Sequence, residues 1–259
     1  MAGLYEDPGE TVVRMTGIER THFAVMKVLR RNFSILSINL RDVSPALAFI
    51  RERRAMGEKI TLASLLIRAV GVALTKYPRL GWMVRGWRLV KPSTADVGCS
   101  VGTESPVSPV VVIRDAGRKS LAQVSEELAR LVGEAREREV AELAKIERGA
   151  KLVPFGWLYR LLLWFLMTRQ RFIRHSVGNF QVTLPRHENI DFGATANTVC
   201  STIMVTRTKD RPMVVDGQVV ARPSVYYCFH FDHAINGAEH GTVFIDEVYR
   251  LMDHPEELL

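Results

Sequence analysis

A histidine near the C-terminal end of the chain has the surroundings expected of a general base. His233 follows Phe229–Asp232, which has the residue pattern of a strand, and precedes Asn236-Gly237, a pair that favours tight turns. An imidazole with its ordinary pKa of about 6.5 is largely neutral at pH 7 and can take a proton. A strand that ends in a turn would aim the ring into a cleft or at a subunit boundary. The same position also suits a structural histidine that is satisfied by a backbone carbonyl, and these residues alone leave both interpretations open.

The elements on either side of this histidine must position it. Apolar residues that alternate with polar ones indicate strands, and apolar residues three or four apart indicate helices. We predict strands over 33–40, 82–84, 87–90, 97–101, 107–113, 176–184, 196–207, 212–221 and 224–232. We predict helices over 17–31, 44–56, 61–77, 120–148 and 238–253. This mixture indicates one α/β domain over residues 16–259 with a mixed or antiparallel sheet, preceded by a flexible arm over residues 1–15.

The composition bounds the class of protein. The chain has 259 residues, 47% of them hydrophobic and 24% charged, which suffices for one large domain with a full core. Its three cysteines are widely spaced, so we expect buried free thiols in a reducing compartment, without a disulfide framework or a metal site. The first residues lack the apolar segment of a signal peptide. These features predict a cytoplasmic protein that holds no bound cofactor.

The net charge of +7 is compatible with phosphates, nucleic acid or an anionic membrane. The arginines are spread along helices, which favours an ordinary solvated basic surface. No zinc finger, RNA-recognition signature or continuous basic recognition helix is present, so we do not expect nucleic acid as a partner. The chain also lacks a Gly-x-Ser-x-Gly elbow, a Walker A motif and a dinucleotide-binding glycine pattern.

One apolar run, residues 152–167, is unusual. A helix that spans a membrane needs about 20 mostly apolar residues, whereas this run is shorter and is interrupted by Pro154, Gly156 and Arg160. We therefore expect a helix that is buried in the fold or in an oligomer contact. A helix at a membrane surface or an acyl-chain site is the alternative, because Trp157 and Trp164 lie beside arginines.

Several segments, taken in chain order, resemble the catalytic domain of the dihydrolipoamide acyltransferases, which shares its architecture with chloramphenicol acetyltransferase. The segments are Thr16-Gly17-Ile18-Glu19-Arg20-Thr21, Asp96-Val97-Gly98, Pro109-Val110-Val111-Val112-Ile113-Arg114-Asp115-Ala116, Gly178-Asn179-Phe180-Gln181-Val182-Thr183, and Asp232-His233 with Asn236-Gly237-Ala238. The resemblance covers roughly residues 16–259. It implies a two-layer α/β fold with a mixed, chloramphenicol acetyltransferase-like sheet covered by helices, and a hydrophobic insertion near residues 150–175.

The resemblance also implies a chemistry. An acyl group would move from a thioester, either acyl-CoA or an acyl group on a carrier, to a thiol, hydroxyl or amine that the sequence does not identify. His233 would be the general base, Thr183 would donate its hydroxyl to the oxyanion, and Asn236 would orient the turn or the reacting group. The site would form between subunits of a homotrimer or of a higher multiple of trimers.

Three further residues would support this site. Asp232 ends the strand, Gly237 belongs to the turn, and Arg20 matches the arginine that pairs with the residue at the position of Asn236 in relatives. Because Asn236 is uncharged, that pair would be a hydrogen bond and not an ion pair.

The chain departs from the family pattern Asp-His-Arg-x-x-Asp-Gly-Ala. Ala234 stands in place of the arginine, the turn is one residue shorter, and Thr183 stands in place of a serine. No lipoyl or subunit-binding domain is recognised, so we do not expect the core subunit of an oxo-acid dehydrogenase complex. The alternative function is therefore a catalytically inactive trimeric scaffold of the same fold, which could lie at a membrane through residues 152–167.

Overall fold

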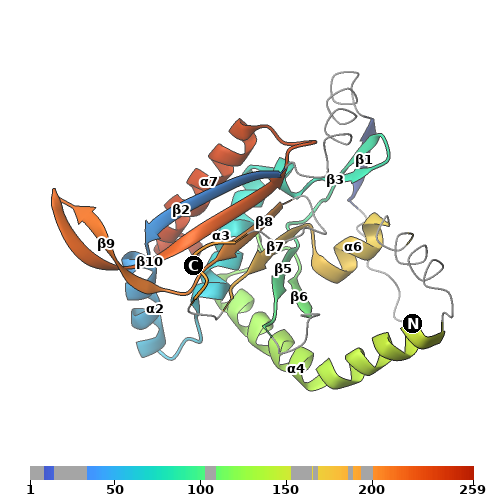
Figure 1. Ribbon diagram of the computed structural model, residues 1–259, viewed down its shortest axis with the longest axis horizontal. Coiled ribbons are helices and arrows are strands. Elements are labelled where there is room, and N and C mark those ends of the chain that lie inside the picture. The colour runs from blue at the N-terminus through green and yellow to red at the C-terminus, as the bar shows by residue number, and fades with distance from the viewer. Residues whose placement is uncertain are drawn as a thin grey trace.

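The computed structural model describes residues 9–14, 34–102, 109–152, 165, 169–185, 189–193 and 201–259. The expected helix over 17–31, Arg20, Cys200 and most of the apolar run 152–167 lie outside the described residues. The strands are β1 (Thr11–Arg14), β2 (Ser34–Asp42), β3 (Met83–Arg85), β4 (Arg88–Lys91), β5 (Val97–Ser100), β6 (Val110–Ile113), β7 (Phe180–Thr183), β8 (Ser201–Val205), β9 (Lys209–Val215) and β10 (Gln218–Asp232). The helices are α2 (Ser44–Ala55), α3 (Leu62–Lys76), α4 (Leu121–Leu152), α6 (Gln170–Val177) and α7 (Ala238–Asp253), with short 3₁₀ turns η1 (Pro78–Gly81) and η2 (Pro255–Leu258) (Figure 1).

The main sheet is mixed. Its described strands follow the order β2-β10-β8-β7-β5-β6, and β9 pairs with the first half of β10. β7 runs parallel to both β5 and β8, whereas the remaining pairs are antiparallel. Because β10 pairs with β8 and β2 up to its last residues, the strand holds Asp232, the residue before His233, in a fixed register.

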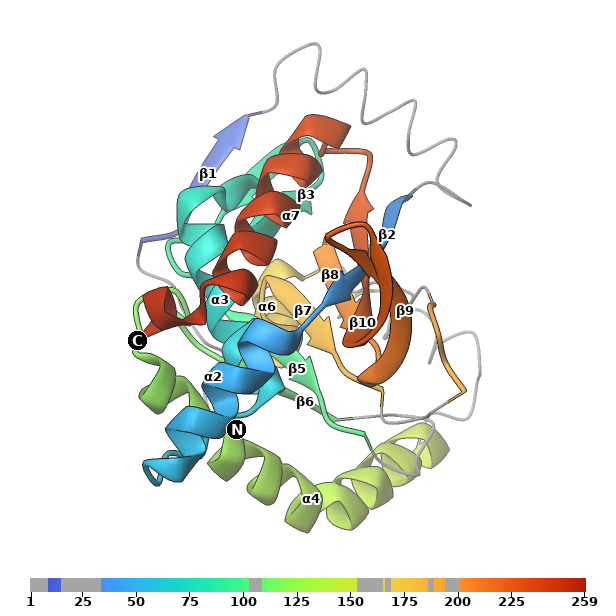
Figure 2. The ribbon, with the colours of Figure 1, turned by 90° about the vertical axis from the view of Figure 1, so that its left-hand side faces the viewer.

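Helices cover one face of this sheet. α2, α3 and α7 lie side by side on that face, and α4 crosses the end of it beside β6 (Figure 2). Alternate residues of β10, namely Val225, Tyr227, Phe229 and Phe231, point into the core that these helices close. The other face carries Leu36 and Ile38 of β2, which are 43% and 38% exposed. This is the two-layer α/β arrangement predicted from the sequence.

Local sequence explains where helix α3 begins and ends. Thr61 Oγ1 accepts a hydrogen bond from the Ser64 backbone N–H at 3.1 Å, and Ser64 Oγ accepts one from the Thr61 N–H at 2.9 Å. This reciprocal capping satisfies two N–H groups that the helix itself cannot. The helix ends before Pro78, as predicted, because proline disfavours helical backbone in the residue that precedes it.

A second, small sheet has the order β1-β4-β3. Its strand β1 corrects the prediction that residues 1–15 form a flexible arm, because Thr11–Arg14 pair with Arg88–Lys91 in antiparallel register. The β-branched pair Val12-Val13 suits a strand, but the segment is too short for its alternation to stand out in the sequence.

Two further predicted strands differ from the structure. The predicted strand over 176–184 is only Phe180–Thr183, because the preceding residues form helix α6. The predicted strands over 212–221 and 224–232 are instead a hairpin that turns at Asp216 and Gly217, followed by one continuous strand to Asp232. Both turn residues have positive φ, 50° and 78°, which is the conformation that an Asp-Gly pair supplies in a two-residue hairpin.

A buried ionic cluster fixes the start of β7. The Asp96 carboxylate is 0% exposed, and its Oδ2 accepts from Arg174 Nε at 3.0 Å and from Arg114 Nη1 at 3.1 Å. Its Oδ1 accepts from Thr94 Oγ1 at 2.8 Å and from the Asp115 N–H at 3.0 Å. We call these five residues the Asp96 cluster. It ties α6 to β5 and β6 and so sets where β7 enters the sheet.

Among the described residues, no helix combines the length and the apolarity needed to cross a bilayer.

Candidate active site

The turn that carries His233 is built from its own backbone. The Asp232 carbonyl accepts hydrogen bonds from the N–H groups of Ile235 and Asn236 at 3.4 and 3.1 Å. The Asp232 carboxylate accepts from the Ala234 N–H at 2.9 Å, which is the local bond that an aspartate supplies at a turn. Helix α7 begins directly afterwards, with Gly237 as its N-cap. The turn is therefore closed at both ends, although it is one residue shorter than the family pattern.

The structure fixes the tautomer of the His233 ring. Nδ1 lies 2.9 Å from the backbone carbonyl oxygen of Asn236. A carbonyl oxygen can only accept, so Nδ1 carries a proton, and in the neutral ring the lone pair is therefore on Nε2. An imidazole in this form is ready to act as a base through Nε2. The carbonyl that holds the ring comes from the third residue after it, so the shortened turn itself supplies the orienting group.

Arg79 holds the same turn from outside, a role that the sequence analysis did not assign. Its Nη2 and Nε donate to the Ile235 carbonyl at 2.8 and 3.2 Å, and its guanidinium lies 5.1 Å from the centroid of the Trp82 ring. Arg79 sits in η1, and its sequence context Tyr77-Pro78-Arg79-Leu80 carries no signal of a contact 156 positions away in the chain.

The small sheet supports the turn with apolar packing. Ala234 and Ile235 are 4% and 6% exposed and form a buried cluster with Leu89 of β4. Trp82 and Val84 pack against this cluster. The residue in the position of the family's arginine, Ala234, is thus part of an apolar contact, and the His233 turn is held between this packing and the hydrogen bonds of Arg79.

Asn236 is fully buried, at 0% exposure. Its Nδ2 donates to the Asp232 carbonyl at a long 3.3 Å, and no donor among the described residues reaches its Oδ1. A buried amide oxygen without a donor is costly, by about 1–3 kcal/mol, and such groups are uncommon in native proteins. Arg20, the partner that the resemblance implies, lies outside the described residues.

His240 completes the end of the turn. Its Nδ1 accepts from the Gly237 N–H at 3.0 Å, so this ring is neutral with its proton on Nε2. Burial lowers the pKa of His240, the charge of Arg79 lowers this pKa further, and Glu239 acts in the opposite direction. The neutral ring is therefore the form that caps helix α7.

Thr183 does not lie near His233 within the chain. It is the last residue of β7 and is level with Met204 of β8, which in turn is level with Cys228 of β10. Asp232, the last residue of β10, lies four residues beyond Cys228, and His233 follows it. The side chains of Thr183 and His233 are therefore two strands apart, and roughly 13 Å or more apart along the strands. A hydroxyl must approach within about 3 Å of a reacting oxygen to stabilise it. One chain alone does not bring His233 and Thr183 together.

A cleft of about 540 Å³ adjoins Thr183. It opens where β5, β7 and β8 end and is lined by Ser100, Leu184, Thr206 and Arg136, among others. Cys99 also lines it, but burial raises the pKa of this thiol to about 11, so it is a neutral thiol and a poor nucleophile at pH 7. Among the described residues, no cluster of histidine, cysteine and carboxylate side chains could hold a metal ion.

The fold that positions this site is also found in known acyltransferases. A probable dihydrolipoamide acetyltransferase of Listeria monocytogenes matches with a TM-score of 0.67 at 16% identity, over 95% of each chain. The Azotobacter vinelandii dihydrolipoamide acetyltransferase, studied for a serine, a histidine and an asparagine in its catalytic mechanism, matches with 0.66 at 20% identity, over 95% of this chain and 92% of its own. Chloramphenicol acetyltransferase matches with 0.54 at 13% identity, over 93% and 100%. The chain therefore has a chloramphenicol acetyltransferase-like fold.

The family follows from the sequence comparison. The model of the 2-oxoacid dehydrogenases acyltransferase catalytic domain matches residues 7–144, and the chain belongs to this family. The match ends before the His233 turn. The succinyltransferase component of the 2-oxoglutarate dehydrogenase complex of Rickettsia felis is 26% identical over 253 residues, which are 95% of this chain and 56% of that protein. The chain thus spans a little over half the length of the curated relatives it matches.

Proposed function

We propose that this protein is an acyltransferase that moves an acyl group from a thioester, acyl-CoA or an acyl group on a carrier, to a thiol, hydroxyl or amine. The observation that carries the proposal is the hydrogen bond from His233 Nδ1 to the Asn236 carbonyl, because it leaves Nε2 as a base in a member of an acyltransferase family. The curated relatives are named as dihydrolipoyllysine-residue succinyltransferase components, which is a name for an acyl transfer.

The proposed reaction assigns a step to each group. Nε2 of His233 takes the proton of the acceptor while the acceptor's oxygen, sulfur or nitrogen attacks the thioester carbonyl carbon. The carbonyl oxygen becomes an oxyanion, to which the Thr183 hydroxyl donates a hydrogen bond. The C–S bond then breaks, and the leaving thiolate takes the proton back from the imidazolium. Asn236, Asp232 and Gly237 shape the turn, and Arg20 is proposed to donate to Asn236 Oδ1.

The proposal includes assembly as a homotrimer or a higher multiple of trimers. Thr183 lies too far from His233 in its own chain, so the donor must come from a neighbouring copy. One solved structure with this fold is the cubic core of the pyruvate dehydrogenase complex. We further propose a cytoplasmic location, which the buried free thiols of Cys99 and Cys228 support.

Replacement of the base tests the proposal. Wild-type protein is offered a panel of acyl-CoA donors with dihydrolipoamide, an alcohol and an amine, and release of the free thiol is followed. We expect His233→Gln to lower the rate by about 10²- to 10⁴-fold, which is the usual contribution of a general base. The control is His254→Gln, since His254 is 60% exposed and lies away from the turn. Equal rates for wild type and His233→Gln would exclude His233 as the base.

Two substitutions test the oxyanion donor. Thr183→Ala should lower the rate by roughly 10²-fold, because one donor contributes about 3 kcal/mol to such a barrier. Thr183→Ser, which restores the family's residue type, should retain the rate of wild type. If both substitutions reduced the rate equally, the hydroxyl would not be the group that matters.

A catalytically inactive scaffold is the second candidate. The shortened turn favours it. Its signature is a folded trimer, identified by light scattering, that consumes none of the thioesters in the panel.

A further inference from the structure

Three arginines line up across the small sheet. Arg14 of β1 lies opposite Arg88 of β4, and Arg88 lies opposite Arg85 of β3. Directly opposed residues share one face of a sheet, so the three guanidinium groups start from adjacent positions on the same side, with strands about 4.8 Å apart. All three residues are exposed. We call them the arginine row.

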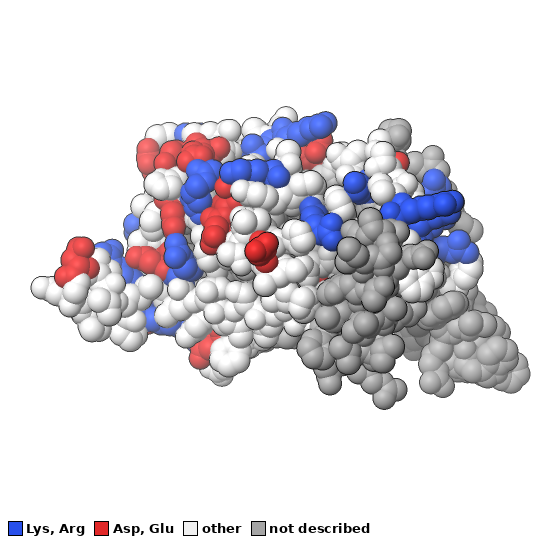
Figure 3. All heavy atoms as spheres, turned by 90° about the horizontal axis from the view of Figure 1, so that it is seen from above, with Lys and Arg blue, Asp and Glu red and all other residues white. Residues whose placement is uncertain are grey.

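The arginine row lacks counter-charges within the part of the chain that the structure describes. None of the three takes part in an ion pair, whereas nearby Arg174 is paired with both Asp96 and Glu10. Like charges directly opposite one another destabilise a sheet. An anion that lies against the row would offset this cost. Figure 3 shows the resulting concentration of basic side chains at this end of the molecule.

The row and the surface beside it favour an extended anionic surface. Its outer members start two strand spacings apart, roughly 10 Å at the backbone, so three positive charges are spread along a line and can contact several anions at once. The neighbouring surface is apolar and aromatic. Trp87, at the tip of the β3–β4 hairpin, is 53% exposed, and Val12, on the same face of β1 as Arg14, is 45% exposed. Tryptophan beside arginine is typical of the level of lipid headgroups.

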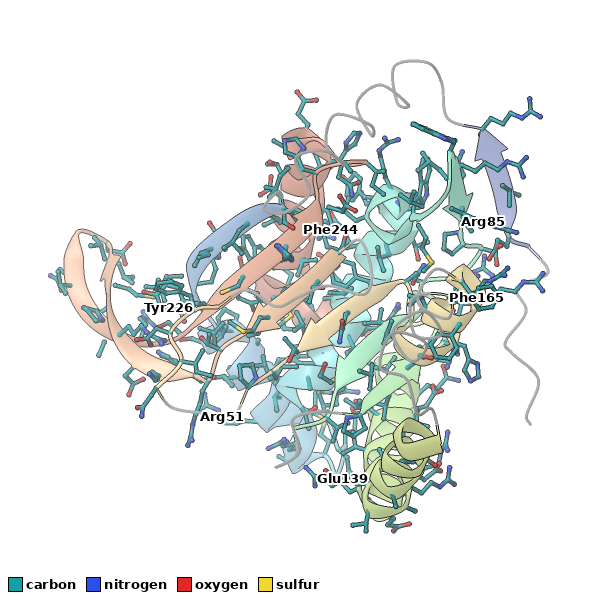
Figure 4. All side chains as sticks on the ribbon, turned by 45° about the vertical axis from the view of Figure 1, so that its right-hand side comes forward. Arg51, Arg85, Glu139, Phe165, Tyr226 and Phe244 are labelled. Carbon is teal, nitrogen blue, oxygen red and sulfur yellow. The ribbon has the colours of Figure 1, made fainter. Side chains whose placement is uncertain are left out.

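A second element adds to this surface. Helix α6 packs against β3 through Phe172 and Ile173, which join Met83 and Val90 in a small apolar cluster. Just before α6, Phe165 is 46% exposed, and the guanidinium of Arg169 lies 4.1 Å from its ring centroid. Figure 4 shows Phe165 and Arg85 on the same side of the molecule, and Arg51 on the other. Basic and aromatic groups from two elements therefore gather on one side.

We propose that the arginine row, with Trp87 and Phe165 beside it, docks this protein onto a membrane surface rich in anionic phospholipid headgroups. The row contacts the phosphate plane, and the exposed aromatic side chains enter the headgroup region. The arginine row lies on the face of the small sheet opposite to the His233 turn, because Leu89, the neighbour of Arg88, is the residue that contacts the turn. Docking therefore leaves the candidate active site open, and it holds whether or not the protein is an acyltransferase.

Vesicle co-sedimentation of the full chain tests the proposal. The probes are vesicles of phosphatidylcholine with phosphatidylglycerol and vesicles of phosphatidylcholine alone. We expect binding to the first kind only, weakened by salt. The triple variant Arg14→Gln, Arg85→Gln, Arg88→Gln should lose about a hundredfold in partitioning, since each basic residue at the surface contributes roughly a fivefold factor. Trp87→Ala should also weaken partitioning, by only several-fold.

The matched control removes the same charge elsewhere. Arg51→Gln, Lys59→Gln, Arg118→Gln changes three exposed residues outside the row and should change binding by only a few-fold. The variant Arg14→Lys, Arg85→Lys, Arg88→Lys keeps the charge and should bind nearly as wild type does, because a phosphate plane needs point charges. Circular dichroism verifies that each variant is folded.

Several results overturn the proposal. Equal losses in the row variant and the control would show that only net charge matters. Wild-type binding to neutral vesicles at high salt would assign the contact to apolar groups alone. If the row variant lost affinity for adenosine 3′,5′-bisphosphate or for a single-stranded oligonucleotide while wild type ignored anionic vesicles, the row would serve a soluble phosphate or a nucleic acid instead.

Discussion

The Asp96 cluster and the His233 turn both bury polar groups, but they satisfy them to different degrees. Both carboxylate oxygens of Asp96 accept two hydrogen bonds each. In the turn, Asn236 is equally buried, yet no described residue donates to its Oδ1. A buried charge that only maintains a fold must be fully paired. A buried amide oxygen without a donor is expected where another molecule or segment supplies the hydrogen bond. Unsatisfied polar groups of this kind concentrate at functional sites. The contrast indicates that the Asp96 cluster maintains the fold, whereas the His233 turn is a candidate functional site.

The largest expected effect concerns the Asp96 cluster. Asp96→Ala leaves Arg174, whose side chain is 2% exposed, without its nearest carboxylate. Breaking one partner of a buried pair costs about 3–5 kcal/mol, so we expect that loss in the free energy of unfolding measured with urea. Asp246→Ala, at an exposed site, should stay within about 0.5 kcal/mol of wild type. Thioester turnover per folded molecule should not change, and a turnover defect in folded protein would contradict the purely architectural role.

The next effect concerns Arg79. Arg79→Leu removes both hydrogen bonds to the Ile235 carbonyl and should lower the free energy of unfolding by about 1.5–3 kcal/mol, the usual value for a charged donor. Because Arg79 also positions the turn, ¹⁵N chemical shifts of His233 should show less of the Nδ1–H tautomer. Arg79→Lys, with its single donor, should recover part of both. An unchanged tautomer in Arg79→Leu would reduce Arg79 to a structural contact.

Asn236 gives a smaller effect, and it tests whether its Oδ1 has a donor. Asn236→Leu has nearly the same shape but removes the oxygen to which Arg20 is proposed to donate and the Nδ2 that donates to the Asp232 carbonyl, so we expect the unfolding free energy in urea to fall by about 1 kcal/mol. Catalysis should fall as well, because the turn loses its polar orienting group. A rise in the unfolding free energy would instead mean that Asn236 Oδ1 has no donor in the folded protein.

His240 provides the smallest effect and a dependence on pH. Its pKa is lowered in the folded protein, so the unfolded chain binds the proton first as the pH falls. Stability is therefore fully present above the ordinary histidine pKa of about 6.5 and declines as the pH falls below that value. The loss of the cap should amount to about 0.5–1 kcal/mol.

Two variants isolate this contribution from that of His230, whose pKa burial also lowers. His240→Gln supplies an oxygen that can accept from the Gly237 N–H as in a capping box, so it should remain stable and lose part of the pH dependence. His240→Leu should lose the cap at every pH. If His240→Gln retained the full dependence in urea titrations at pH 5 to 8, the effect would belong to His230.

Helix α7 and the strand ending at Asp232 were predictable from the sequence because each has a strong local signal. α7 matches its predicted bounds, Ala238–Asp253, since an Asn-Gly turn precedes it and its apolar spacing is regular. The family resemblance and the fold were also predictable, from short motifs in a fixed order. The Asp216-Gly217 hairpin was missed even though its turn signal is local, and β10 continues through Pro223 at the point where it leaves β9.

The supporting contacts of the candidate site were not predictable. Arg79 reaches Ile235 only because the 3₁₀ turn after α3 packs beside the small sheet, and nothing in either segment encodes that approach. The tautomer of His233 depends on a backbone carbonyl, which every residue possesses. Sequence patterns identify side chains that could do chemistry, whereas the partners that orient them are set by tertiary packing. The assigned roles of His233, Thr183, Asn236 and Arg20 remain predictions.

The placement of Thr183 and His233 at opposite ends of the sheet would make catalysis a property of the assembly. Under the proposed function, specific activity should fall when the protein is diluted enough for its protomers to separate. Two inactive preparations, one with His233→Ala and one with Thr183→Ala, should regain turnover after subunit exchange, because mixed oligomers contain pairings in which both intact groups meet.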